Sequence, residues 1–315
     1  MKSIRRSLVS FFWLTALGVI LCTTAFAHAP TTVNGVVGVP CPSRTGLYCI
    51  SYGSGDPILA LHGLGASTYT WRNLVGNPRF RNNKLILIDF LGAGQSPKPH
   101  NKKYSIIDQA DLIYDFIQEY DLKNLTLMGN SYGGAVSLYL AIRLRDSDRL
   151  KRLILVDSGG YDKDLPGFLK VLRTPLIGWL AVNILTPKQQ AGIVLHAAYY
   201  DKHKITQPQI DAYAEPIGSP GGRYALLQTG RGAIPEHLQR IVDQYPTINV
   251  PTLIIWGLDD KVLPLKIGKM LHEAIPGSRL ELINNCGHVP QEEMPAETIC
   301  WIAEFLGLPF EPCPK

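Results

Sequence analysis

The feature that most limits how this chain can fold is a serine between two glycines, Gly129-x-Ser131-x-Gly133. The apolar run 125–128 before it predicts a short buried strand, and the apolar spacing after it predicts a helix. A sharp strand-to-helix turn strains the backbone of its central residue and needs neighbours almost without side chains. The pattern therefore predicts a nucleophile elbow that lifts the serine hydroxyl above the strand end. A glycine-rich turn is the alternative, so partner residues must support the reading.

The rest of the chain alternates buried strands with helices on both sides of this elbow. The predicted strands span 57–61, 84–89, 125–128, 153–156, 250–256 and 279–283. Continuous apolar strands separated by helical patterns indicate an α/β fold with an open, mostly parallel sheet. We expect its core in residues 28–157 and 246–315.

The strand–helix alternation stops between residues 158 and 245. This stretch combines helical runs with seven prolines and has no strand pattern. We interpret it as a helical lid inserted over the ends of the sheet. A second layer covering the sheet, with no role at a site, is the alternative.

Residues 1–27 have the composition of a secretory signal peptide. Basic residues open the segment, an apolar stretch follows over 8–21, and Ala25-Phe26-Ala27 forms a small-x-small cleavage site. We predict cleavage after Ala27 or Ala29 and a secreted or periplasmic protein. An uncleaved membrane anchor is the alternative, although the apolar stretch is short for a spanning helix.

Loss of this segment changes the charge of the protein. It contains three basic residues and no acidic ones, so the formal charge falls from +5 to +2. The remaining chain has no Lys/Arg cluster of the kind that binds nucleic acid. We therefore expect a small-molecule substrate, no nucleic-acid partner and no stable membrane insertion after signal cleavage.

The cysteines agree with an oxidising compartment. Cys41 and Cys49 are spaced for a disulfide-closed hairpin, and Cys300 with Cys313 could tie the last helix to the C-terminal tail. Cys286 would then remain unpaired. Buried thiols at all five positions are the alternative. No spacing of cysteines or histidines predicts a metal site.

A serine nucleophile needs a base, and the base must lie at the same edge of the sheet. His288 follows the last predicted strand, in a loop that Gly287 makes flexible, and we predict that it is the base. His196, in the insertion, is a distant second candidate.

The base in turn needs an acid that orients its ring. Asp260 and Asp259 both follow the penultimate strand, and the turn after Trp256 favours Asp260 facing inward. Asp157, which ends an earlier parallel strand, is the third candidate.

A loop after the 57–61 strand could stabilise negative charge on a reacting carbonyl. Gly63 allows the backbone to approach the substrate, so the N–H of Leu64 could donate to it together with the N–H of Tyr132. His62 is interpreted as a structural residue that holds this loop. Gly92-x-Gly94 does not predict dinucleotide binding, because no helix opens after it, and no cofactor is expected.

These motifs together resemble the α/β-hydrolase fold family over residues 45–308. The resemblance rests on His62-Gly63, Asp89-x-x-Gly92-x-Gly94-x-Ser96, Gly129–Gly134, Trp256-Gly257-x-x-Asp260-x-x-x-Pro264 and Cys286-Gly287-His288, in that order. It implies the order Ser, Asp, His for the catalytic residues. Dehalogenases and epoxide hydrolases of this fold carry aspartate at the elbow, so Ser131 argues against both.

Residues 129–135 are also similar to the carbon–carbon bond hydrolases of aromatic ring cleavage, although Tyr132 replaces their usual methionine and their lid arginine has no clear counterpart. The sequence therefore predicts an exported serine hydrolase acting on a small, fairly apolar ester or related acyl compound. Carbon–carbon cleavage or acyl transfer by the same residues is the first alternative. A hydrolase-fold binding protein is the second.

Overall fold

The computed structural model describes residues 31–101, 103–162 and 165–308. The predicted signal segment, and Cys313 of the second predicted disulfide, lie outside the described residues. A central eight-stranded sheet has the strand order β10-β9-β8-β7-β5-β6-β4-β3. Strands β5 to β10 run parallel, while β3 and β4 pair antiparallel at one edge. The fold class predicted from the sequence is confirmed.

The strands are short and follow the apolar runs closely. Their bounds are β3 Val39–Pro40, β4 Cys49–Tyr52, β5 Asp56–Leu61, β6 Asn83–Ile88, β7 Leu125–Asn130, β8 Leu150–Val156, β9 Thr252–Gly257 and β10 Arg279–Ile283. A separate two-stranded sheet joins β1 (Thr32–Val33) to β2 (Val36–Val37).

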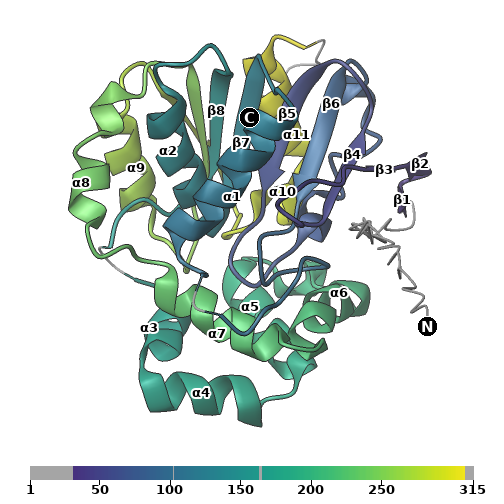
Figure 1. Cartoon of the computed structure of the whole chain (residues 1–315), viewed down its shortest axis with the longest axis vertical. Coiled ribbons are helices and arrows are strands. Elements are labelled where there is room, and N and C mark those ends of the chain that lie inside the picture. The colour runs from purple at the N-terminus through teal and green to yellow at the C-terminus, as the bar shows by residue number, and fades with distance from the viewer. Residues whose placement is uncertain (1–30, 102, 163–164, 309–315) are drawn as a thin grey trace, which may run out of the picture.

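Helices cover both faces of the sheet (Figure 1). The helices that pack with the core strands are α1 Ile106–Glu119, α2 Tyr132–Leu144, α9 Leu265–Ala274, α10 Pro290–Glu293 and α11 Pro295–Leu306. Alternate strand residues enter two different apolar clusters, one beneath α1, α2 and α9 and the other beneath α11. This two-sided burial explains why the central strands are apolar throughout instead of alternating.

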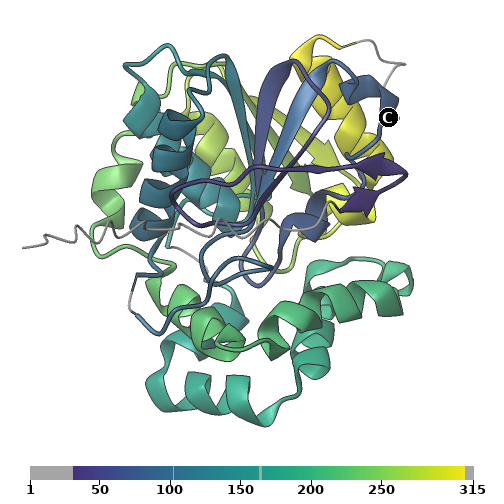
Figure 2. The same cartoon turned by 45° about the vertical axis from the view of Figure 1, so that its right-hand side comes forward.

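The segment between β8 and β9 contains six helices: α3 Gly167–Arg173, α4 Pro175–Ile184, α5 Pro187–Ala198, α6 Gln207–Gly218, α7 Gly222–Gly232 and α8 Leu238–Val242. Helices α3 to α7 lie together beyond one end of the sheet, as Figures 1 and 2 both show. That end is the carboxyl edge of the parallel strands, where the predicted site residues follow their strands. No helix in the described ranges is long and apolar enough to span a bilayer.

Residues 70–74, where the sequence also predicts the start of a helix, form only a 3-10 turn over Thr68–Trp71. Ser67 caps it, and its backbone bonds join residues three apart, such as Arg72 N–H to Tyr69 O at 3.1 Å. The side chains of Thr70 and Arg72 both bind Glu292, more than 200 residues away. These contacts hold a short turn where the sequence predicts the start of a helix. The remaining 3-10 segments are Pro78–Phe80, Lys202–Lys204 and Tyr245–Thr247.

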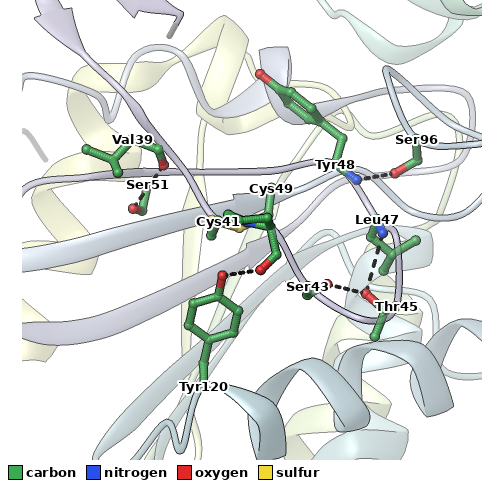
Figure 3. Close-up of a disulfide and its surroundings, with 11 residues drawn as sticks. Val39, Cys41, Ser43, Thr45, Leu47, Tyr48, Cys49, Ser51, Ser96 and Tyr120 are labelled. Atoms are coloured by element: carbon green, nitrogen blue, oxygen red, sulfur yellow. Dashed lines mark hydrogen bonds between the residues drawn. A yellow bond between two sulfur atoms is a disulfide. The ribbon is translucent and has the colours of Figure 1, made fainter. Parts of the chain in front are cut away.

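A hairpin between β3 and β4 carries the first pair of cysteines (Figure 3). The sulfur atoms of Cys41 and Cys49 are at bonding distance, the Cα atoms are 5.1 Å apart, and Cys41 N–H donates to Cys49 O. Tyr48, beside this pair, donates its N–H to Ser96 Oγ at 2.8 Å. The pair thus joins the two ends of the hairpin loop. Cys286 is unpaired and buried.

Candidate active site

The elbow at Ser131 has the strained geometry that its sequence predicts. Ser131 stands between β7 and α2 with φ 54° and ψ −114°, a region that side chains disfavour. A Cβ atom on Gly129 would lie 2.3 Å from the carbonyl oxygen of Gly133, and one on Gly133 would lie 2.3 Å from that of Leu61. Both glycines are therefore required for the turn to close against the neighbouring strand.

His288 and Asp260 form a buried pair in the loops that follow β10 and β9. Nδ1 of His288 lies 2.7 Å from Oδ2 of Asp260, and the other carboxylate oxygen accepts the N–H groups of Val262 and Leu263 at 2.7 and 2.9 Å. These N–H donors fix the carboxylate, which in turn fixes the Nδ1–H tautomer of the ring. Nε2 then remains as the nitrogen that can accept a proton. Asp259 does not contact the histidine ring.

Ser131 and His288 line the same cavity, together with Leu64. The side chain of Asn130 helps to bring these loops together: its Nδ2 donates to His288 O at 3.1 Å and to Val156 O at 3.0 Å. The residue before the serine therefore fixes the backbone of the histidine. The carboxyl edge of the sheet thus brings Ser131, Asp260 and His288 into one site.

Asp157, the third candidate for the acid, lies behind this pair. It follows β8 with φ 40°, its side chain is fully buried, and Oδ1 accepts the N–H of Gly257 at 3.0 Å. Its Oδ2 is buried and has no hydrogen-bond partner among the described residues. Burial, and secondly the charge of Asp260, raise the pKa of the Asp157 carboxyl well above its usual range. We therefore describe Asp157 as a neutral acid that can donate a hydrogen bond toward Asp260.

The loop after β5 is held by His62. Its Nε2 accepts the N–H of Phe90 at 3.1 Å, so Nδ1 carries the proton and donates to Gly63 O at 2.8 Å. Full burial lowers the pKa of His62 and keeps the ring neutral. The structural role that the sequence indicates for His62 agrees with these contacts.

The two predicted oxyanion donors lie on either side of the serine. A Cβ on Gly63 would lie 3.4 Å from the Cβ of Ser131, which places the Gly63–Leu64 peptide against the elbow. Within the described ranges, the backbone N–H groups of Leu64 and Tyr132 have no hydrogen-bond acceptor. Tyr132 is the first residue of α2, where a free N–H is expected at a helix N-terminus.

A larger, mainly apolar pocket adjoins Ser131, with a cavity volume of about 80 Å³ against about 30 Å³ for the cavity that Ser131 shares with His288. Its walls come from α2, from α3 and its preceding loop, from the segment around α8, and from single core residues. The lining residues are Leu64, Ile106, Ser131, Tyr132, Ala135, Tyr139, Gly159, Gly160, Tyr161, Leu165, Pro166, Phe168, Leu169, Ala233, Ile234, Pro235, Leu238, Ile241, Tyr245 and Leu263. None of these described lining residues is charged, so the pocket suits an uncharged, apolar group.

Two glutamates after His288 connect the site to the inserted helices, and the sequence analysis did not identify them. Glu293 accepts the N–H groups of Gly287 and Tyr200 on Oε2 at 2.8 and 3.0 Å. Glu292 is buried between Arg72 of the core and Tyr213 of α6. Apart from Gly287, these partners lie about 80 to 220 residues away along the chain, so no local pattern could reveal them.

Asp157, Asp260 and His288 also form a group whose ligand atoms lie within 4.8 Å of one another. A metal ion could use such a set. However, His288 Nδ1 and Asp260 Oδ2 already bond each other directly, so two of the three potential ligand atoms are engaged. His196, the second candidate base, is exposed on α5 and its Nδ1 contacts Gly192 O.

Comparison with known proteins agrees with this architecture. Residues 56–295 match a family model described as the alpha/beta hydrolase fold. An uncharacterised protein of Mycobacterium tuberculosis is 32% identical over 267 residues, which cover 81% of this chain and 76% of that protein. The 2-hydroxy-6-oxo-2,4-heptadienoate hydrolase of Pseudomonas putida is 27% identical over 264 residues, covering 81% of this chain and 90% of that enzyme.

A solved structure supports the same relationship. The meta-cleavage product hydrolase of Pseudomonas fluorescens IP01 superposes with a TM-score of 0.69 at 25% identity. The match covers 89% of this chain and 97% of that protein.

Proposed function

The chain belongs to the α/β-hydrolase fold family, and on this premise we propose that it is an exported serine hydrolase of small, apolar esters or related acyl compounds. The observation that carries the proposal is the His288–Asp260 hydrogen bond at 2.7 Å beside the cavity that Ser131 and His288 share. A strained serine and a tautomer-fixed imidazole are the two parts that acyl transfer requires.

In the proposed mechanism Ser131 Oγ attacks the carbonyl carbon while Nε2 of His288 takes the hydroxyl proton. Asp260 stabilises the imidazolium that forms. The N–H groups of Leu64 and Tyr132 donate to the carbonyl oxygen as it becomes negative, and loss of one such donor typically costs about 10² to 10³ in rate. His288 then protonates the leaving alcohol, and water, activated by the same ring, releases the acid from Ser131.

Labelling with a fluorophosphonate probe tests this mechanism directly. We expect the mature protein to form one stoichiometric adduct on Ser131, and we expect Ser131→Ala to form none. His288→Gln should label at least about 10²-fold more slowly, because the hydroxyl loses its base. An unlabelled wild type, or equal labelling of Ser131→Ala, would contradict the enzyme proposal and favour a hydrolase-fold binding protein.

The uncharged pocket supports a neutral acyl group. We propose that the acyl chain lies along Leu165, Phe168 and Leu169, which line the pocket beside Ser131. A panel of p-nitrophenyl esters of increasing acyl length tests this placement. Phe168→Ala should shift the preferred acyl length upward, whereas Phe305→Ala, far from the pocket on α11, should leave the preference unchanged.

Carbon–carbon bond cleavage is a second candidate, because the Pseudomonas putida relative is named for a dienoate substrate. A dienoate is a carboxylate and calls for a cation in the binding pocket. The described lining residues of the large pocket include none. Assays of ring-fission dienoates and of their methyl esters distinguish ester hydrolysis from carbon–carbon cleavage. Turnover of the free acids alone would favour carbon–carbon cleavage.

Two further proposals concern export and the inserted helices. We propose that residues 1–27 are removed during export and that the Cys41–Cys49 disulfide forms in the oxidising compartment. N-terminal sequencing of the exported protein should give a start after Ala27 or Ala29.

We also propose that residues 158–245 act as a lid over the site, because Leu165, Phe168 and Leu169 of this segment line the pocket.

A further inference from the structure

The outer face of α4 is apolar although it faces solvent. Leu176, Leu180 and Ile184 follow one another at intervals of four residues, and Ile177 lies beside them. Leu176 is 68% exposed and Ile184 is 72% exposed. A helix on the surface of a soluble protein normally places polar residues on this face. Here no residue of α4 is charged.

Helix α4 touches the rest of the protein through a narrow strip. Only Gly178 and Val182 of α4 are buried, and they point to the side opposite Leu180. Its main neighbours are α3 and α7. In Figure 1 α4 forms the lower edge of the molecule, and after the rotation in Figure 2 it still lies at that edge. The apolar face therefore forms a projecting ridge.

Three further exposed apolar side chains lie on α4 itself and on the helices before and after it in the chain. Trp179 of α4 is 53% exposed, and Val171 of α3 and Ile193 of α5 are also exposed. An exposed tryptophan is notable because its large ring with one N–H suits the boundary between water and hydrocarbon. We call Leu176, Ile177, Trp179, Leu180 and Ile184 the α4 ridge.

The two helices that pack against α4, α3 and α7, carry basic side chains and no acidic ones. There is no Asp or Glu between residues 165 and 200 or between 216 and 235. Arg231 donates to Pro175 O at the start of α4, Arg223 donates to Asn183 O near its end, and Arg173 and Lys170 lie on the adjoining turn of α3. None of these four cations has a carboxylate partner among the residues that the structure describes.

An exposed apolar ridge beside basic side chains distinguishes between two kinds of partner. A second copy of the chain, related by a two-fold axis, would bring the same arginines against each other around a shared apolar contact, and the like charges would repel. An anionic lipid surface instead offers hydrocarbon for the ridge and negative headgroups for these basic side chains. The charge pattern therefore favours the lipid surface.

We propose that the α4 ridge docks this protein on anionic lipid surfaces, with α4 lying in the plane of the interface and Arg173, Arg223 and Arg231 contacting lipid phosphates. The binding is peripheral, because α4 has ten residues and is too short to span a bilayer. Helix α3, joined to α4 at Thr174, lines the large pocket through Phe168 and Leu169. Docking therefore places the pocket wall next to the lipid.

Co-sedimentation with vesicles tests the proposal independently of any catalysis. The probe is the Ser131→Ala protein without residues 1–27, mixed with vesicles of phosphatidylglycerol and phosphatidylcholine or of phosphatidylcholine alone. We expect binding to the anionic vesicles that weakens as salt is added, and at least about tenfold weaker binding to the neutral ones. Blue-shifted tryptophan fluorescence should accompany binding and should be absent in Trp179→Phe.

The deciding variant is Leu176→Ser/Ile184→Ser. Both side chains are exposed, so folding should be retained, and circular dichroism with the melting temperature verifies this. We expect at least tenfold weaker binding to anionic vesicles. The matched control is Val37→Ser/Leu282→Ser, which removes two exposed apolar residues from other faces and should bind like the parent.

Three results would overturn the proposal. The first is no binding to anionic vesicles at low salt. The second is unchanged binding by Leu176→Ser/Ile184→Ser. The third is a dimer in analytical ultracentrifugation that this variant converts to monomer, because the ridge would then be a contact between two copies.

Discussion

His288 Nδ1 and Asp260 Oδ2, 2.7 Å apart, connect the loops that follow the last two strands of the sheet. The carboxylate is held in one orientation, because its other oxygen accepts hydrogen bonds from two backbone N–H groups. An acid held in this way can select one tautomer of the ring without moving during the reaction. The consequences for activity can be measured.

Asp260→Asn should keep the shape of the site but lose the tautomer selection. The amide of the new asparagine can donate an N–H to Nδ1 of His288. The ring proton then lies on Nε2, which can no longer act as a base. We expect kcat for ester hydrolysis to fall by about 10³ to 10⁴, with KM changed only a few-fold. Asp259→Asn is the matched control and should stay within about twofold of wild type. Equal losses in both variants would contradict the assignment.

Asp157 should lower the stability of the fold as the pH rises. Below its ordinary pKa of 3.8 the carboxyl is protonated in both the folded and the unfolded chain. Above that value the unfolded chain loses the proton, while the folded chain keeps it up to its own raised pKa. In this window the folded state binds more protons, so the free energy of unfolding falls by at most about 1.4 kcal/mol per pH unit. The groups that face it are Asp260, Glu293 and Cys286.

Asp157→Asn should remove this slope, because the amide stays neutral while its oxygen can still accept the N–H of Gly257. Urea unfolding from about pH 4 to pH 8 should show a flatter dependence on pH than wild type. Asp148→Asn, an exposed acid, should leave the slope unchanged. We expect activity within a few-fold of wild type, since the amide still donates toward Asp260. A loss as large as that of Asp260→Asn would instead make Asp157 the catalytic acid.

Glu292→Gln should destabilise the protein, because it leaves the guanidinium of Arg72 without its buried partner. Removing one member of a buried ion pair typically costs about 3 to 5 kcal/mol. The midpoint of urea unfolding measures the loss. Combining Arg72→Met with Glu292→Gln should recover part of the lost stability. If none is recovered, the hydrogen bonds from Thr70 and Tyr213 to Glu292 contribute more than the ion pair does.

The disulfide should stabilise the hairpin only modestly, because it closes a short loop. Cys41 and Cys49 are eight residues apart, for which the chain-entropy relation gives about 2.5 kcal/mol. The Cys41→Ala/Cys49→Ala protein should therefore unfold at lower urea concentration with an unchanged slope. Its labelling at Ser131 should match wild type, since the hairpin lies at the opposite edge of the sheet from His288. Loss of labelling would show that the hairpin also shapes the site.

The sequence indicated the fold and the central residues because both depend on local patterns. Apolar runs mark the strands, and the parallel direction brings their carboxyl ends together, so Ser131, Asp260 and His288 could be placed at one edge. The structure also pairs Asp260 with His288 in preference to Asp259. The position of Asp157 behind that pair could not be predicted, because it depends on a single residue with positive φ after β8.

Other features depend on contacts between distant segments. Helix α4 has no charged residue, and only its position at the edge of the inserted helices shows that its apolar side chains are exposed. The expected helix at Thr70 became a 3-10 turn because Glu292, far along the chain, binds its side chains. Asn130 is next to the serine in the sequence, yet its bond to His288 O forms only in the folded sheet.

The bonds between the end of α5 and the histidine loop have a mechanical consequence. His288 N–H donates to Ala198 O at 2.6 Å, and Glu293 holds Gly287 and Tyr200 together. If all the inserted helices moved away as one body, they would pull His288 away from Asp260. We therefore expect helices α5 and α6 to stay fixed to the core while helices α3 and α4 move. Substrate entry would then depend on the α3–α4 half of the insertion, and support of the His288 loop on the α5–α6 half, so either could change in evolution without disturbing the other.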